Sequence, residues 1–462
     1  MNAPPRQITL DEWDERYEAL AAAGLPEPAY GGPLRRHVAD GDFRLLRLRF
    51  DNSAAALRLW NFLLTEEDRL REARAAGKRL VGTMKDLGTV PVMAYSSPNL
   101  VAFYPDGAWW IPCVMELSAG LLGIADSLGI DESFCPVRAM LGAFVTGAHF
   151  PLPDLITCSV GATCDDFSAI AQRLNGLGYP ILWWEIPHRR RPDAGERGVR
   201  LPGGFEAPQS QVAFVRSELE RLRRALEELA GGRLDDEALS AGIRAANRVR
   251  RALDALRREV YTAEPCPLPA LEMLIAEMLA IHFCSDRDET VAVLKELIEE
   301  VRRRIGARAG LPANGAVRVF WVNPVADLRA MNLLEEYGGR ICGTDYLFCH
   351  ALDAIPEDAP PLEALARMAL ADPMVGPAAD RAARVCSDIH AFGAEAVVVS
   401  RIPGASHCAT EGRVIADAVQ SNLGIPTAEI EVPPVSDSLT PTIRSRLEAL
   451  METARERRRA HV

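Results

Sequence analysis

Three of the ten cysteines lie where a chain could bind a metal or a ligand. Cys164 follows an apolar run that is typical of a strand, and it precedes a predicted helix. Cys408 follows a second apolar run and a short loop, and it too precedes a predicted helix, while Cys135 lies in a turn before a third helix. The N-terminus of a helix stabilises a thiolate. Each of the three positions therefore suits a reactive or metal-binding cysteine.

Two interpretations of these cysteines are open at the level of the residues. Ligand sites in open parallel sheets gather beyond the carboxyl ends of the strands. If Cys164 and Cys408 belong to two such sheets, both thiols can face one cleft between them and share a soft metal with Cys135. Alternatively, each thiol packs separately as a small hydrophobic side chain, as most cysteines inside cells do.

The other cysteines are weaker candidates for metal ligands. Cys158 lies six residues before Cys164, near the end of the same predicted strand, and is either an additional ligand or a buried strand thiol. Cys342 and Cys349 lie near a strand of the C-terminal half and could approach the same cleft. No two cysteines form the C-x-x-C pair of zinc ribbons, thioredoxins or bacterial ferredoxins. We interpret four cysteines as packing residues: Cys113, Cys266, Cys284 and Cys386.

Short apolar runs that alternate with helical stretches must position these cysteines. The N-terminal runs lie at 80–83, 155–158 and 181–184, and the C-terminal runs lie at 317–322, 340–342, 396–400 and 427–432. Runs of this kind, separated by helices, predict parallel strands covered on both faces. The sequence therefore predicts two α/β lobes of similar architecture with a cleft between them.

The strands and helices divide the chain into five predicted segments. Residues 188–211 are rich in Gly, Pro and Arg and predict a loop at the end of the first lobe. Leucines at helical spacing after this loop predict a helical region between the lobes. The segments are a helical N-terminal segment (1–77), the first α/β lobe (78–211), a helical segment (212–312), the second α/β lobe (313–435) and a C-terminal helix (436–462).

Composition and missing motifs restrict the function. With 52 basic and 64 acidic residues the net charge is -12, which argues against nucleic acid as a partner. No apolar run reaches the roughly 18–20 residues of a membrane helix, and the first residues do not resemble a secretory signal, so we expect a cytoplasmic protein with reduced thiols. The sequence contains neither a P-loop, nor a G-x-G-x-x-G after a strand, nor a G-x-S-x-G elbow.

Three stretches follow one another in the order found in a known family. Residues 134–142, FCPVRAMLG, combine a cysteine with a short Arg-containing helix and Gly. Residues 151–165 run from a strand into a Thr-Cys-Asp turn, and the tail at 423–449 contains LGIPT, Asp437 and IRSRLEA. In this set, which covers most of residues 78–455, the chain resembles the iron–sulfur family of 2-hydroxyacyl-CoA dehydratases and benzoyl-CoA reductases.

The resemblance implies a fold and a cofactor. The fold would consist of two Rossmann-like (flavodoxin-like) parallel-sheet lobes with a cleft between them. Cys135, Cys164 and Cys408 would hold an oxygen-sensitive [4Fe–4S] cluster, with Cys158 as a further candidate ligand. Three protein thiolates leave one iron of the cubane open to water, a serine or substrate.

The implied function is that of the iron–sulfur, D-component-type subunit of an ATP-activated 2-hydroxyacyl-CoA dehydratase, a lyase driven by single electrons. Its partners would be an acyl-CoA thioester, a homologous second subunit or a second copy, and a separate ATP-hydrolysing iron–sulfur activator. A benzoyl-CoA reductase subunit, an oxidoreductase, shares the motifs. A homodimeric reductase with a double-cubane [8Fe–9S] cluster and a non-catalytic binding protein of the same fold are further alternatives.

Polar residues near the cysteines are candidates for supporting roles. His407 and Glu411 flank Cys408, where they could transfer protons or hydrogen-bond to a cluster sulfur. Ser406 could reach the open iron. Arg189 and Arg190 lie in a basic run that could bind the phosphates of coenzyme A, although such runs are more often solvated loops.

Overall fold

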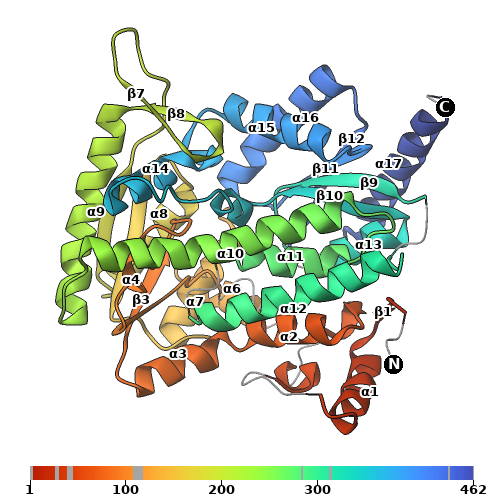
Figure 1. The fold of residues 1–462 in the computed structure, drawn as a ribbon, viewed down its shortest axis with the longest axis horizontal. Helices are drawn as coiled ribbons and strands as arrows, with labels where there is room; N and C mark the ends of the chain where they lie inside the picture. The colour runs from red at the N-terminus through yellow and green to blue at the C-terminus, as the bar shows by residue number, and fades with distance from the viewer. Residues whose placement is uncertain are drawn as a thin grey trace.

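Two four-stranded parallel sheets form the centre of the molecule, and helices cover both faces of each sheet (Figure 1). The computed structural model describes residues 4–25, 31–38, 45–107, 118–281, 285–311, 315–434 and 437–460. Within these ranges, no helix combines the length and the apolar character needed to cross a membrane.

The first sheet has the strand order β4-β3-β5-β6, and all its neighbouring strands are parallel. Its strands are β3 (Arg79–Met84), β4 (Leu100–Phe103), β5 (Leu155–Gly161) and β6 (Ile181–Ile186). The chain passes from β3 to β4 on one side and then to β5 on the other. The gap between β3 and β5 is therefore the topological switch point, where open parallel sheets bind ligands.

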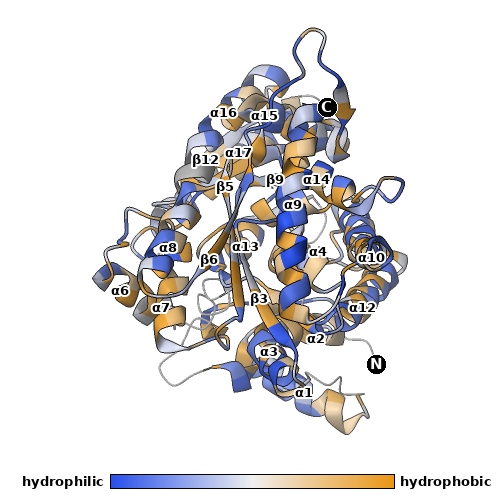
Figure 2. Cartoon of the chain, turned by 90° about the vertical axis from the view of Figure 1, so that its left-hand side faces the viewer, coloured by the Kyte–Doolittle hydropathy of each residue, from blue (hydrophilic) through white to orange (hydrophobic). Residues whose placement is uncertain are grey.

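Two layers of helices enclose this sheet, which Figure 2 shows edge-on. The helices are α4 (Val90–Ala94), α6 (Ser118–Ser127), α7 (Ala139–Thr146), α8 (Asp165–Gly176) and α9 (Gln209–Ala230). Helices α6, α7 and α8 pack on the face that carries Leu80, Met84 and Cys158. Helices α4 and α9 pack on the opposite face, which carries Val81 and Trp184.

The second sheet repeats this order as β10-β9-β11-β12, again with parallel neighbours. Its strands and main covering helices are β9 (Val317–Val322), β10 (Gly339–Asp345), β11 (Ala396–Arg401), β12 (Thr427–Glu431), α13 (Arg329–Glu336), α15 (Ala378–Ala391), α16 (Ser406–Leu423) and α17 (Thr440–Ala460). The common order confirms the predicted fold class, with two Rossmann-like parallel-sheet lobes.

The carboxyl ends of the two sheets pack against each other. Met84, at the end of β3, and its partner Cys158 on β5 belong to one apolar cluster with Ala326, Ile402 and Ala405, from the loops after β9 and β11. In addition, α8 of the first lobe contacts α16 of the second. The two switch points therefore lie at the contact between the lobes.

A layer of long helices joins the lobes on their outer side (Figure 1). Helix α10 (Asp236–Thr262) contacts α4 in the first lobe and β10 in the second, and it packs along α12 (Arg287–Gly306). Its buried residues recur at helical spacing, for example Leu239, Ile243 and Ala246, so one stripe of the helix faces the core. The other helices of this layer are α2 (Ala54–Leu64), α3 (Glu66–Ala75), α11 (Ala270–Met278) and α14 (Pro361–Ala371).

The remaining elements of the fold are short, and two strands among them lie where a loop was predicted. They are β1 (Gln7–Ile8), α1 (Leu10–Ala22), β2 (Phe50–Asp51), β7 (Gly198–Arg200), β8 (Glu206–Pro208) and the 3-10 helices η1 (Leu34–His37), η2 (Leu45–Arg47), η3 (Pro136–Arg138), η4 (Pro202–Gly204), η5 (Leu347–Ala351) and η6 (Pro373–Val375). The prediction of a loop at 188–211 is wrong in part, because β7 and β8 pair there as an antiparallel ribbon. Strand β4 was not predicted.

Candidate functional site

Each of the three predicted ligand cysteines lies at the start of a helix. Cys164 is the N-cap residue of α8, immediately after β5, and Cys135 is the N-cap residue of η3, which leads into α7. Cys408 lies in the first turn of α16. The side chains of residues 406–409 lie outside the described part of the structure, so Ser406, His407 and Cys408 are located only by their backbone.

The three cysteine-bearing segments are in contact. Helix α8 touches both η3 and α16. A Cβ atom on Gly404, in the loop before Cys408, would lie 2.4 Å from the carbonyl oxygen of Phe134 and 2.9 Å from that of Glu132. The loop before Cys408 therefore packs backbone against backbone on the turn before Cys135, and only glycine fits there.

Asp166, in the first turn of α8, connects the two described thiol segments. The backbone N–H of Cys135 donates to its Oδ1 at 3.4 Å, and the thiol of Cys164 donates to its Oδ2 at 3.5 Å. Both cysteines are half-buried, at the edge of the apolar cluster between the lobes. Among the side chains that the structure describes, no three His, Cys, Asp or Glu residues form a metal site, but the Cys408 side chain is not in that set.

The chemistry of this donor set fits an iron–sulfur cluster. Thiols are the soft ligands that such clusters require. Cys135 and Cys164 retain access to solvent, and both lie at helix starts that favour thiolates. Apolar side chains such as Phe134 and Ile402 surround them, which limits the access of water.

Lys85 is a residue of this site that sequence reasoning missed. It directly follows β3 at the switch point, in a left-handed conformation with φ 59°. Its ammonium is buried and donates to the hydroxyl of Ser168 in α8 at 3.1 Å. Burial lowers the pKa of Lys85, whereas nearby Cys158 and Cys164 act to raise it. The available sequence signal was a basic residue at the end of an apolar run.

The second lobe has an equivalent position. Asn323 directly follows β9 and is also left-handed, with φ 65°. The hydroxyl of Ser400 on β11 donates to the Asn323 carbonyl at 2.8 Å, just as Ser159 on β5 donates to the carbonyl of Lys85. Non-glycine residues in this conformation cost of order 1–3 kcal/mol and concentrate at functional sites. Both lobes hold such a residue at their contact.

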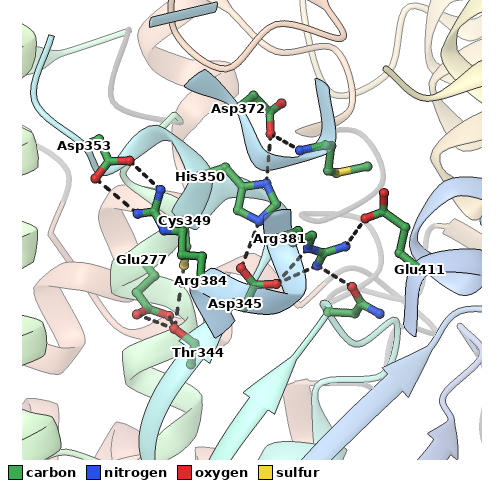
Figure 3. Close-up of polar contacts among 12 residues, drawn as sticks. Glu277, Thr344, Asp345, Cys349, His350, Asp353, Asp372, Arg381, Arg384 and Glu411 are labelled. Atoms are coloured by element: carbon green, nitrogen blue, oxygen red, sulfur yellow. Dashed lines mark hydrogen bonds and ion pairs between the residues drawn. The ribbon is translucent and has the colours of Figure 1, made fainter. Parts of the chain in front are cut away.

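Arg381 of α15 fixes the helix that carries Cys408 (Figure 3). Its side chain is 1% exposed, and Nη1 donates to Oε2 of Glu411 at 2.8 Å. Nη2 donates to Oδ2 of Asp345 at 2.7 Å and to Oδ1 of Asn323 at 2.8 Å. Glu411, one of the predicted proton-transfer residues, is therefore tied by an ion pair to the ends of β9 and β10.

His350 extends this network from Asp345 to Asp372, the N-cap residue of η6 (Figure 3). Its Nε2 lies 3.0 Å from Oδ1 of Asp345, and its Nδ1 lies 3.0 Å from Oδ1 of Asp372. Burial by itself lowers the pKa of His350, but the two carboxylates outweigh burial and raise the pKa. Burial would raise the pKa of Asp345, yet Arg381 and His350 hold it well below its usual value. The contact between His350 and Asp345 therefore favours the charged forms of both groups.

Three further cysteines lie in the core. Burial raises the pKa of Cys158 to about 12 and that of Cys342 to about 12, and it raises the pKa of Cys349 well above its ordinary value. Thiols of this kind resist the deprotonation that metal binding requires. These observations favour the interpretation of Cys158 as a buried strand thiol.

The cysteines interpreted as packing residues divide into two groups. Cys266 and Cys386 are buried, as expected. Cys113 and Cys284 lie outside the described residues.

Arg189 does not occupy the exposed position that phosphate binding needs. It is 1% exposed, its Nη1 donates to the carbonyls of Leu370 and Asp372, and its guanidinium stacks on Phe205. This buried position does not support the prediction that Arg189 binds coenzyme A, and its side chain instead links the end of the first lobe to the end of α14. Arg190 is exposed and pairs with Glu196 at 2.6 Å.

The comparisons with known proteins agree with the geometry. The family model for the 2-hydroxyglutaryl-CoA dehydratase D-component matches residues 102–454, about three quarters of the chain. The match contains all three cysteine segments and the Arg381 network. No curated protein matches the chain. The chain belongs to the 2-hydroxyglutaryl-CoA dehydratase D-component family.

Proposed function

We propose that this chain is the iron–sulfur subunit of an ATP-activated, one-electron-driven 2-hydroxyacyl-CoA dehydratase. In this proposal Cys135, Cys164 and Cys408 hold a [4Fe–4S] cluster. The observation that supports it best is the contact between the three cysteine-bearing segments at the switch points of both sheets, in a chain of this family.

The cluster would supply chemistry that protein side chains lack. Held by three thiolates, a cubane provides single electrons at low potential and one iron position that the protein does not occupy. The chain itself orients the donors: Asp166 bonds to both the Cys135 backbone and the Cys164 thiol, and Gly404 allows the third segment to approach.

Dehydration of a 2-hydroxyacyl thioester also requires proton transfer, because a hydroxyl leaves and a β-proton is removed. His407 and Ser406 remain our candidates for groups that meet the substrate, since both lie in the first turn of α16 beside Cys408. We assign Glu411 to positioning rather than proton transfer, because Arg381 holds its carboxylate in a buried ion pair.

Membership of the family implies partner subunits and a CoA substrate. We propose a homologous second subunit or a second copy of this chain, a separate ATP-hydrolysing iron–sulfur activator, and a cytoplasmic location. The double-cubane alternative loses support because its extra candidate ligands, Cys158, Cys342 and Cys349, are buried thiols with raised pKa values.

An activity assay on anaerobically purified protein tests the proposal and separates lyase from reductase. The protein, its partner subunit, a matched activator and ATP are incubated with 2-hydroxyacyl-CoA thioesters or with benzoyl-CoA, and products are identified by mass spectrometry. The proposal predicts an enoyl-CoA product that needs ATP and disappears in Cys164→Ala. Ring-reduced product from benzoyl-CoA would instead identify a reductase, and no turnover of any thioester would contradict both.

A further inference from the structure

Lys85 is an unusual residue in this chain. Only three lysines occur among its 52 basic Lys and Arg residues. Lys78 and Lys295 are exposed, whereas Lys85 is buried, with 8% of its surface exposed. A buried ammonium is costly unless an anion compensates it.

The position of Lys85 is fixed from two directions. The hydroxyl of Ser159 on β5 binds its backbone carbonyl at the end of β3, where φ is 59°. Its Nζ bonds to the Ser168 hydroxyl in the first turn of α8. Cys164 is the N-cap residue of the same helix, so the ammonium lies against the helix whose first turn carries the Cys164 thiol.

The charge of Lys85 has no close partner among the described residues. No carboxylate there lies within 4 Å of Nζ, and its one hydrogen bond is to a neutral hydroxyl. The helix N-terminus beside it carries a partial positive charge, which adds to the cost of a cation. The groups that act to raise its pKa are two thiols and two carboxylates: Cys158, Cys164, Asp165 and Asp166.

In the second lobe, a buried cation does contact carboxylates. Arg381 also reaches the switch-point end of its sheet and is 1% exposed, but its guanidinium contacts the carboxylates of Asp345 and Glu411. Among the described residues, the first lobe therefore contains a buried cation that contacts no carboxylate, and the second contains one that contacts two.

We infer that Lys85 is a positioning residue whose ammonium offsets the negative charge of the thiolate-held iron–sulfur centre. The inference rests on the proposed function, and it adds an electrostatic role for a residue that lies before the region matched by the family model. A cation at this place stabilises the reduced, more negative state of the centre, and so it makes the reduction potential less negative.

The test compares Lys85→Gln, Lys85→Arg and the exposed control Lys78→Gln in the anaerobically purified full-length protein. Gln retains a donor for Ser168 but removes the charge, and Arg retains the charge. Iron and sulfide contents and the midpoint potential, from a redox titration followed by electron paramagnetic resonance, are measured for each protein.

We expect the midpoint potential of Lys85→Gln to be more negative than that of the wild type by at least about 59 mV, which corresponds to a tenfold change in the one-electron equilibrium constant. Lys85→Arg should shift it less, and Lys78→Gln should match the wild type. Loss of the cluster in Lys85→Gln with retention in Lys85→Arg would also support a charge requirement.

Two results would overturn the inference. One is a wild-type potential in Lys85→Gln, and the other is equal loss of the cluster in the Gln and Arg variants. Absence of iron from the wild-type protein would overturn the proposed function itself, which distinguishes the two failures.

Discussion

Replacement of Arg381 by Met is expected to destabilise the second lobe locally and strongly. The guanidinium is 1% exposed and bonds to Asp345, Glu411 and Asn323 at 2.7–2.8 Å. Removing it takes the guanidinium away from two buried carboxylates, Asp345 and Glu411, although His350 still contacts Asp345. Breaking a buried ion pair in this way costs about 3–5 kcal/mol. In hydrogen–deuterium exchange, protection of the amides in β11 and α16 should therefore fall by roughly 150- to 5,000-fold.

A matched exposed arginine provides the control. The Arg413 side chain on α16 is 70% exposed and pairs with Asp417 and Glu429, so Arg413→Met should leave the protection of the amides close to that of the wild type. Adding Glu411→Gln to Arg381→Met should recover part of the protection, because it removes the carboxylate charge that Arg381 neutralises in the wild type. If Arg381→Met and Arg413→Met reduce protection equally, the network does not hold α16 and the reasoning fails.

Two further predictions concern the same region. Because the folded-state pKa of His350 is raised, its contribution to stability is complete below about pH 6.5 and is lost as the pH rises through the folded value. The denaturant midpoint of His350→Gln should thus differ most from the wild type in acid, and a difference that grows with pH would contradict the assignment. Gly404→Ala should weaken the contact between the cysteine segments and lower the iron content of the protein. Gly424 is the control, because it also has a positive φ but an added Cβ would meet no atom closer than 4.0 Å, so Gly424→Ala should keep its iron. Equal iron contents in the two variants would show that the close approach at Gly404 is unimportant.

The sequence predicted those features that depend on local pattern. Cys164 could be placed beside a ligand site because an apolar run precedes it and a helix follows, and such turns lie at the carboxyl edge of a parallel sheet. Strand β4, Leu100–Phe103, was missed although it is as long as the predicted run at 80–83, because the pattern of a short apolar run does not distinguish a strand from a buried helix segment. Local patterns therefore located the lobes and the cysteines.

Features that depend on long-range packing could not be predicted. Arg189 belongs to a run of basic residues typical of a solvated loop, and nothing local reveals that it stacks on Phe205 between the lobes. The hydrogen-bond partners of Arg381 come from three separate elements, and no sequence motif indicates that they meet. The role of Lys85 could not be predicted either, because it depends on a fold that brings its ammonium to Ser168 on α8.

The most direct test of the central claim is the iron and acid-labile sulfide content of the anaerobically purified protein, combined with electron paramagnetic resonance. We predict about four irons per chain in the wild type and in Cys266→Ala, which removes a buried core thiol. Cys164→Ala should lose the signal while it keeps its far-ultraviolet circular dichroism. A wild-type protein without iron, or an unchanged signal in Cys164→Ala, would contradict the claim that the cysteine segments hold a cluster between the lobes.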